Sequence, residues 1–268
     1  MSRGYRFNGA ADSLALLWGA QDRSGRRTRS NLSLDKIVTS AVELADTEGL
    51  AALSMRRVAE RLGIGTMTLY TYLPGKDELI DLMLDSCYGE TVPARTPPGN
   101  WRVRLENIAH RGWELYERHP WMLQVPRARP ALGPGATAKY EHELSTVAGI
   151  GLTEIEMDLV VNLVTGHVEG TARRRLEAAQ TEQSTGMTDQ QWWEANGPML
   201  RTVADAERFP LAARVGEVTG EAYGGVFAPA RAFEFGLHRV LDGVQSFIDS
   251  RTQGTPMAGT HPPGKTDV

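Results

Sequence analysis

The sequence contains a single cysteine, Cys87, and no apolar run long enough to cross a membrane. One cysteine excludes internal disulfide bonds and suits a chain that works in a reducing cytoplasm. Because Cys87 falls on the apolar face of an expected helix, we interpret it as a small core residue rather than a redox sensor. The stretch from Leu14 to Trp18 is short and follows Asp12, so it predicts neither a transmembrane helix nor a signal peptide. We therefore expect a cytoplasmic protein that does not enter the membrane.

Several sequence signatures of catalysis are also missing. The chain has no phosphate-binding loop, no nucleophile elbow and no pair of carboxylates in a recognisable catalytic frame. His110, His119, His142 and His167 include no pair at close metal-ligand spacing within one expected helix, so no metal site is predicted. A helical enzyme is an alternative that no motif supports, and we expect neither catalytic residues nor a cofactor.

The chain lacks the net positive charge of many nucleic-acid-binding proteins, since 33 acidic residues outnumber 29 basic ones and the formal charge at pH 7 is −4. Its basic residues are nevertheless clustered locally. Arg26, Arg27 and Arg29 lie in a polar stretch rich in Ser, Gly and Thr. Such a stretch either follows the DNA minor groove or remains a solvated tail. We treat residues 1–31 as a flexible basic arm.

Residues 54–76, SMRRVAERLGIGTMTLYTYLPGK, predict two short helices joined by a glycine-bounded turn. Ser54 can cap the first helix and Gly63 ends it. The second helix is expected from Thr66 to Tyr72. This pattern is typical of a helix-turn-helix, in which the second helix enters the DNA major groove.

Helical patterns also flank this pair. Ser33 opens a helix that Gly49 ends, and another helix begins at Lys76 with acidic residues in its first turn. Residues 32–90 should therefore form a three-helix DNA-binding head followed by a connecting helix.

Residues 33–90, above all TEGLAALSMRRVAERLGIGTMTLYTYLPGKDELI, resemble the DNA-binding domain of the TetR family of repressors, across four consecutive expected helices without gaps. In a helix-turn-helix, the first turn of the second helix meets base edges, so Thr66, Met67 and Thr68 are the candidates for base contact. Their hydroxyl and methyl groups suit thymine methyls and single hydrogen bonds. The resemblance places Arg56 within reach of a base or a phosphate. It also implies phosphate contacts from Ser54, Tyr70, Tyr72 and Lys76.

The segment TVPARTPPGN, residues 91–100, breaks the helical pattern and marks the joint between the head and a larger body. In the body, apolar residues recur at helical spacing from Trp101 to Tyr116, from Thr153 to about Gln180, and from Pro229 onward. We expect an all-α fold with a ligand-binding and dimerisation domain at residues 91–250. Residues 251–268 show no apolar face and should be a disordered tail.

The last expected helix carries a long apolar stripe that needs to be covered. It could pack entirely in the core, but a helix-turn-helix needs two copies to read two half-sites. The resemblance implies that this helix and the long one before it form a four-helix dimer interface. Gly166 and Gly170 would allow a close backbone approach there. We therefore expect a homodimer.

The body contains large aromatic and polar side chains suited to a ligand pocket. The candidates are Trp113, Tyr116, Trp121, Gln124, Asn162, His167 and Trp192. Together they predict a pocket for a sizeable, partly planar molecule, although any single tryptophan is more simply explained as core.

The segments NWRVRLENIAHRGWELYERHPW and VTGHVEG resemble the tetracycline-repressor branch of the family. This chain departs from that branch at its drug-binding and metal-binding positions. Ile108 stands where the branch has a drug-gripping Asn, and Gly112 stands where it has an aromatic residue. Val125 and Arg175 occupy its metal-related positions. We therefore expect a ligand other than magnesium-bound tetracycline.

These patterns together predict a ligand-responsive repressor that binds a palindromic operator as a homodimer and is released by a small antibiotic-like molecule or metabolite. By analogy with the family, the regulated gene would encode an exporter or a modifying enzyme. The alternative within the same class is an activator, or a constitutive regulator without a ligand.

Overall fold

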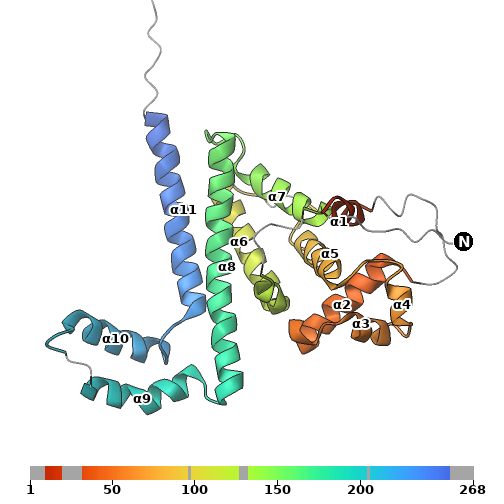
Figure 1. Ribbon diagram of the computed structural model, residues 1–268. Coiled ribbons are helices and arrows are strands. Elements are labelled where there is room, and N and C mark those ends of the chain that lie inside the picture. Colours follow the sequence, from red (N-terminus) through yellow and green to blue (C-terminus); the bar gives the residue numbers. More distant parts are fainter. Residues whose placement is uncertain (1–9, 20–31, 96–97, 127–131, 204–205, 254–268) are drawn as a thin grey trace, which may run out of the picture.

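A computed structural model describes residues 10–19, 32–95, 98–126, 132–203 and 206–253. All elements in these segments are helical, as expected for an all-α fold. Figure 1 shows a compact group of short helices, which forms the head, beside a body dominated by two long helices, α8 and α11. None of the described helices is long and apolar enough to cross a membrane.

The head begins with a well-capped helix and continues into the helix-turn-helix. Its elements are α2 (Leu34–Glu48), the 3₁₀ turn η2 (Leu50–Ala52), α3 (Met55–Arg61) and α4 (Thr66–Leu69). The hydroxyl oxygens of Ser33 and Ser54 accept hydrogen bonds from the backbone N–H groups of Lys36 and Arg57. Gly49 ends α2 with φ 81°, a conformation that side chains rarely adopt. The expected capping residues therefore set these helix ends.

The second helix of the pair, α4, ends at Leu69 rather than at Tyr72. The chain instead continues in turns, and the side chains of Leu69 and Leu73 are both fully buried against the head. Packing of these two leucines holds the tight turn that replaces a further helical turn.

The connecting helix α5 (Lys76–Gly89) joins head and body, since it packs on α2 on one side and on α7 of the body on the other. Its inward residues include Leu79, Met83 and Cys87, all fully buried. Any shift of α5 relative to the body must therefore move the head.

The amino-terminal segment differs from the expected flexible arm. Residues Ala10–Leu17 form a short helix, α1, which packs on α5. Leu16 and Leu17 are buried in the head's core, and the Trp18 indole N–H donates to the Leu132 carbonyl at 2.9 Å. The apolar stretch noted in the sequence therefore packs as a core element. Residues 20–31, which include Arg26, Arg27 and Arg29, lie outside the described residues.

The core of the body is built from α6, α7, α8 and α11 together with one 3₁₀ turn. These elements are α6 (Trp101–Arg118), η3 (Pro120–Gln124), α7 (Pro134–Val147), α8 (Glu154–Thr185) and α11 (Pro229–Gln253). The expected helix from Thr153 onward is α8, and Thr153 and Glu156 form a capping box at its start. The core between α6, α8 and α11 includes Leu105, Val164 and Leu237, all fully buried. Since α11 extends to Gln253, residues 251–253 are helical rather than part of a disordered tail, and residues 254–268 lie outside the described part of the chain.

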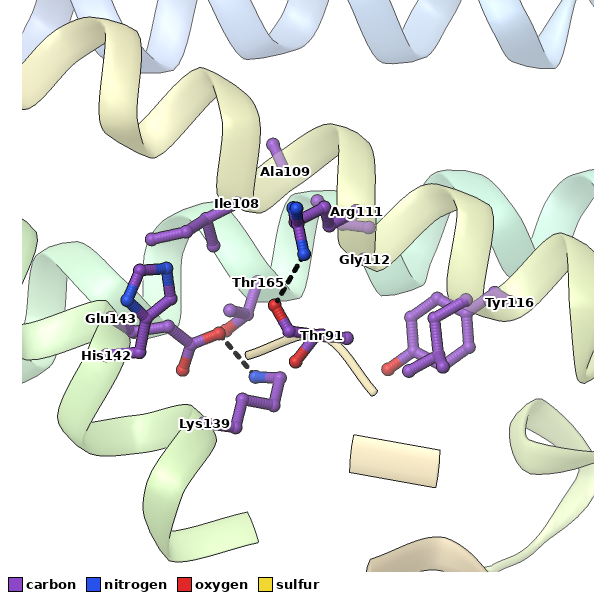
Figure 2. A pocket seen from close by; sticks show the side chains of 12 residues that line it. Thr91, Ile108, Ala109, Arg111, Gly112, Tyr116, Lys139, His142, Glu143 and Thr165 are labelled. Atoms are coloured by element: carbon purple, nitrogen blue, oxygen red, sulfur yellow. Dashed lines mark hydrogen bonds and ion pairs between the residues drawn. The ribbon is translucent and has the colours of Figure 1, made fainter. Parts of the chain in front are cut away.

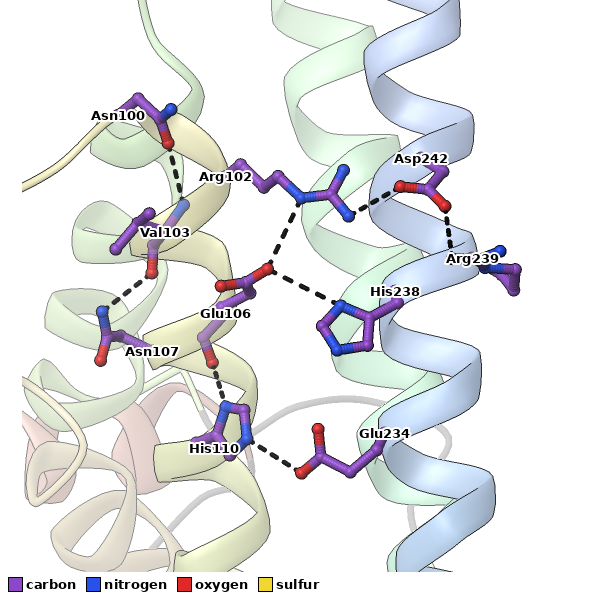
Figure 3. A network of polar contacts seen from close by, with 10 residues as sticks. All are labelled: Asn100, Arg102, Val103, Glu106, Asn107, His110, Glu234, His238, Arg239 and Asp242. Carbon is purple, nitrogen blue, oxygen red and sulfur yellow. Dashed lines mark hydrogen bonds and ion pairs between the residues drawn. The ribbon is translucent and has the colours of Figure 1, made fainter.

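Polar pairs along one side fix α6 against α11 (Figure 3). The pairs are Arg102–Asp242 at 2.7 Å, His110–Glu234 at 3.1 Å and His238–Glu106 at 3.9 Å. They lie at the edge of the apolar core and set the register of the two helices.

Two helices, α9 (Asp189–Val203) and α10 (Pro210–Tyr223), pack on each other and extend from the lower end of α8 and α11 (Figure 1). Thr188 and Gln191 cap the start of α9 by reciprocal hydrogen bonds between the side chain of each residue and the backbone N–H of the other. The ring of Trp193 packs directly on the backbone at Gly220, where any Cβ atom would lie 1.9 Å from the ring. A glycine at this position is what allows the two helices to meet.

Candidate functional site

The surface of α4 carries the side chains expected to meet DNA bases. Leu69 faces the core, whereas Met67 is 77% exposed and Thr68 is also exposed. Thr66 begins the helix and is half-buried. The exposed side of the first turn of α4 is therefore small, uncharged and available for contact.

Arg56 lies on the outer side of α3, with its side chain 79% exposed and its guanidinium 3.1 Å from the Glu60 carboxylate. An exposed ion pair of this kind contributes little to stability, so the guanidinium can change partner at low cost. Ser54 caps α3, and its hydroxyl still has a proton to donate.

The expected phosphate contacts lie at the end of α4 and the start of α5. Tyr70 is 43% exposed, and Tyr72 is half-buried with its hydroxyl donating to the Leu32 carbonyl at 3.4 Å. Lys76 is the first residue of α5, where unpaired backbone N–H groups favour an anion. The three side chains therefore border the reading surface rather than form part of it.

The body contains a cavity between α6, α7 and α8, shown in Figure 2. It is lined by Thr91, Ile108, Ala109, Arg111, Gly112, Leu115, Tyr116, Lys139, His142, Glu143, Thr165 and Val168. Its volume of about 30 Å³ leaves room for about two water molecules. Pockets that hold drug-sized ligands measure roughly 300–1,000 Å³, so a sizeable ligand would have to widen this cavity.

The α7 side of the cavity is charged. Glu143 is only 3% exposed, and its carboxylate pairs with the ammonium of Lys139 one turn earlier. His142 lies beside them, and burial together with the nearby Arg111 guanidinium lowers its pKa. A neutral imidazole at this position could accept or donate a hydrogen bond. The Arg111 guanidinium donates to the Thr91 carbonyl at 3.4 Å.

The α6 side of the cavity is mainly apolar. A Cβ atom added to Gly112 would lie 3.3 Å from a methyl group of Val168, so the glycine permits close approach of α6 and α8. Tyr116 lines the opposite end, and burial of its hydroxyl, with Tyr88 close by, raises its pKa. The phenol therefore stays neutral and can act as a hydrogen-bond donor.

Of the seven ligand-binding candidates, the structure brings Tyr116 to this cavity and places the other six elsewhere. Trp113 is buried in the core, with its ring 4.6 Å from that of Phe233. His167 lies on the same side of the core, and its Nε2 is 2.9 Å from the Phe233 carbonyl. Both residues help to fix α11 on the body.

The remaining four candidates are dispersed. Trp121 is buried at the joint between head and body, and its indole N–H donates to Asp46 at 2.8 Å. Gln124 is exposed at the end of η3, and the Asn162 amide donates to a carbonyl of its own helix. Trp192 is 40% exposed on α9. The sequence interpretation did not identify the charged lining residues Arg111, Lys139, His142 and Glu143, although the spacing of Lys139 and Glu143 already suits an ion pair.

A buried carboxylate connects the cavity wall to the head. Asp85 of α5 is 7% exposed and accepts hydrogen bonds from the backbone N–H groups of Gly135 and Ala136 at 3.1 and 2.8 Å. It thus caps the first turn of α7, the helix that carries Lys139 and Glu143. Because Gly135 meets the backbone of Asp85 directly, α7 and α5 cannot separate without breaking this contact.

Comparison with known proteins gives the same architecture. Residues 37–83 match the family model for bacterial regulatory proteins of the tetR family, and residues 92–248 match the tetracyclin repressor-like C-terminal domain. The chain is 43% identical over 243 residues to the HTH-type transcriptional repressor DrrR1 of Streptomyces coeruleorubidus, covering 90% of this chain and 87% of that one.

Solved structures of ActR from Streptomyces coelicolor are also similar. Apo ActR superposes with a TM-score of 0.68 at 24% identity, over 84% of this chain and 100% of that one. ActR in complex with actinorhodin superposes with a TM-score of 0.66 at 25% identity, over 81% and 97% of the two chains. The chain is therefore a member of the TetR family of DNA-binding transcriptional regulators.

Proposed function

We propose that this protein is a repressor that binds a palindromic operator as a homodimer and leaves it when a small molecule enters the cavity between α6, α7 and α8. The observation that carries this proposal is the buried Asp85 contact, which ties the cavity wall α7 to α5 and so to the reading head. The relative ActR is seen in complex with actinorhodin, which supports a small-molecule effector.

On DNA, α4 would enter the major groove with Thr66, Met67 and Thr68 against base edges. These side chains lack the forked donors of Arg or Asn, so direct readout by α4 is modest. Arg56 would add a guanidinium at the groove edge, while Ser54, Tyr70, Tyr72 and Lys76 would position the head on phosphates. The arm residues Arg26, Arg27 and Arg29 would add salt-dependent affinity.

A second copy would cover the apolar surface that α8 and α11 leave exposed. On α8, Ile155, Leu159 and Leu163 are 74%, 59% and 52% exposed, and Phe235 and Phe247 of α11 are also exposed. Gly166 and Gly170 have no atom within 4 Å of an added Cβ, so their side of α8 is open to a partner. An apolar row of this length on one face is typical of an interface.

The effector would act by widening the cavity. Since its volume is far below that of a sizeable ligand, binding must displace α7 from α6 and α8. Asp85 then transmits this movement to α5, and the two heads of the dimer change their spacing. The charged pair of Lys139 and Glu143 supplies anchors for a ligand with both acidic and basic groups.

The test begins with DNA selected from a random library by the purified full-length protein. We expect an inverted repeat whose half-sites lie roughly one or more helical turns apart, about 34–36 Å each. A compound found by screening should then lower operator affinity at least about tenfold. Operator binding that no cell extract or compound relieves would contradict the effector mechanism and favour a constitutive regulator.

A cavity-filling variant locates the effector site. Gly112→Ala adds one methyl group to the cavity wall beside Val168 and should weaken release by the compound, while operator affinity stays close to that of the wild type. Ala138→Leu, on the exposed side of α7, is the matched control and should respond like the wild type. Equal release in both variants would place the effector elsewhere.

A further inference from the structure

A second cluster of polar groups lies at the joint between head and body, away from the cavity. Asp46 lies in α2 and Cys87 lies in α5, while Glu90 is the residue that follows α5 and caps its end. His119 follows α6, and Trp121 lies in η3. His119 and Trp121 are 4% and 1% exposed, whereas the side chains of Asp46 and Glu90 are 25% and 39% exposed, so the cluster extends from the interior to the surface.

The hydrogen bonds of Asp46 fix the tautomer of His119. The Asp46 carboxylate oxygen accepts from the Trp121 indole N–H at 2.8 Å and lies 2.7 Å from His119 Nδ1. A carboxylate has no hydrogen to give, so His119 Nδ1 must carry the proton. In the neutral ring the other nitrogen, Nε2, therefore presents a lone pair.

That lone pair faces another acceptor. His119 Nε2 lies 3.4 Å from a carboxylate oxygen of Glu90. Two acceptors at this distance repel each other unless a proton or a cation lies between them. The Arg118 guanidinium pairs with the same oxygen of Glu90 from the outside, and its side chain is 56% exposed.

Cys87 is the third residue of the cluster, beside Glu90 and His119, that could bind a metal ion. Its thiol is fully buried, and one donor atom each from Cys87, Glu90 and His119 all lie within 4.8 Å of one another. A tetrahedral zinc ion requires donor atoms roughly 3.3–3.7 Å apart, given its usual bond lengths. The Nε2–Glu90 separation of 3.4 Å already meets this requirement, and the Cys87 sulfur, which lies within 4.8 Å of both partners, needs to move by no more than about 1.5 Å.

We propose that Cys87, Glu90 and His119 form a binding site for a divalent transition-metal ion of the Zn²⁺ type, with one water molecule as the fourth ligand. Asp46 holds the imidazole by its Nδ1–H, an arrangement typical of metal-bound histidines. The charges balance, since a dication and Arg118 offset Asp46, Glu90 and a Cys87 thiolate. Sulfur, nitrogen and oxygen donors together suit zinc or cobalt rather than magnesium.

A metal ion here would tie α5 to the end of α6 and, through Asp46, to α2. Burial raises the pKa of the Cys87 thiol to about 12, with the charges of Glu90 and Asp46 adding to the shift. The thiol is therefore protonated without metal, and binding releases that proton. The alternative to a metal ion is a proton between His119 Nε2 and the Glu90 carboxylate, and this alternative does not involve Cys87.

The test uses the full-length protein without a histidine tag, stripped of metal by a chelator and titrated with Co²⁺. We expect one ion per chain, a thiolate-to-cobalt charge-transfer band in the near ultraviolet, and visible bands with the intensity of four-coordinate cobalt. Zn²⁺ should displace Co²⁺ and raise Tm by several degrees. Absence of the charge-transfer band would overturn the proposal and leave a proton as the occupant.

Substitutions of single residues test which side chains bind the metal ion. Cys87→Ser should remove the charge-transfer band, and Asp46→Asn should weaken Co²⁺ affinity about 10- to 100-fold. His110→Gln alters a histidine–carboxylate pair elsewhere on α6 and should leave the titration unchanged. Because Cys87→Ser could unfold this buried site, Glu90→Gln at a 39% exposed side chain provides a second test and should also weaken binding. A wild-type cobalt spectrum in a folded Cys87→Ser or Glu90→Gln variant would contradict the assignment.

Discussion

Among single residues, Glu143 is a buried charged side chain in the lining of the cavity between α6, α7 and α8. Its carboxylate is almost wholly screened from solvent and has the Lys139 ammonium as its partner. Lys139→Met should lower the free energy of unfolding by about 3–5 kcal/mol, because it leaves a buried charge without its partner. The double variant Lys139→Met, Glu143→Gln should recover most of that loss, as measured by urea denaturation. A double variant as unstable as the single one would show that the pair is not coupled.

His110 should make stability depend on pH. Burial alone would lower its pKa, but the Glu106 carbonyl and the Glu234 carboxylate more than offset this effect and raise the pKa above 6.5. The ion pair therefore contributes fully below about pH 6.5 and is lost as the pH rises through the raised value. Both side chains are about half exposed, so the contribution is at most about 1 kcal/mol.

Glu234→Gln should accordingly destabilise the protein at about pH 5.5 and have little effect at about pH 8.5. Urea midpoints for both proteins at the two pH values measure this difference. Asp249→Asn, near the end of the same helix, is the control, because Asp249 accepts a hydrogen bond from the Gln245 amide and not from a histidine. A destabilisation of the same size at both pH values would contradict a role for the His110 charge.

The candidate reading residues follow from their position in a helix-turn-helix, and the structure leaves Arg56, Met67 and Thr68 exposed, while their contact with DNA stays a prediction. The cavity was less predictable. Aromatic size pointed to Trp113 and Trp121, which instead pack in the core and at the joint. Which face of a helix lines a cavity depends on contacts between distant segments, and one sequence does not encode those contacts in a local pattern.

At the scale of elements, the point where α5 and α7 cross should not accommodate any side chain at Gly135. A Cβ at Gly135 would lie 2.0 Å from the Asp85 backbone carbonyl, so neither atom can move away by a side-chain rotation. Gly135→Ala should therefore force the helices apart and destabilise the protein by about 1–3 kcal/mol or more. Thermal unfolding monitored by circular dichroism would measure the loss.

Gly216→Ala in α10 is the matched control, because an added Cβ there meets no atom within 4 Å. Replacing a helical glycine by alanine in open space should stabilise the protein by about 0.5–1 kcal/mol. The two glycine-to-alanine substitutions should thus change the free energy of unfolding in opposite directions. Equal effects would mean that α5 and α7 do not meet as closely as the structure indicates.

Elements with strong caps were predicted well, whereas weakly marked ones were not. Ser33, Ser54 and Thr153 identified the starts of their helices correctly. The α10 segment was missed because Gly216 and Gly220 lower its helix propensity, and its glycine contact with Trp193 arises only when α9 and α10 pack. The helix α1 was missed because a short apolar stretch carries no information about the α5 surface that covers it.

For the whole molecule, α5 is an element that all three proposed binding events would act on. It begins at Lys76, a proposed phosphate contact, meets α7 at Asp85, and reaches the joint cluster at Cys87. Operator, effector and metal would therefore compete or cooperate by favouring different positions of one helix. Because binding effects are reciprocal, a metal ion that strengthens operator binding must itself be bound more tightly on the operator.

The homodimer itself can be tested on the exposed row of α8. Leu159→Glu with Leu163→Glu places two charges per chain, and four per dimer, in the proposed interface. Each leucine contributes about 1.5–3 kcal/mol when buried, so dimerisation should weaken by at least about a thousandfold. Sedimentation equilibrium should show a monomer, and operator affinity should fall because one head reads only one half-site. Leu14→Glu, at an exposed leucine on α1, is the control and should remain dimeric. If the double variant kept its dimer, the α8 row would not be the interface, and the spacing of the two heads would have to depend on another surface.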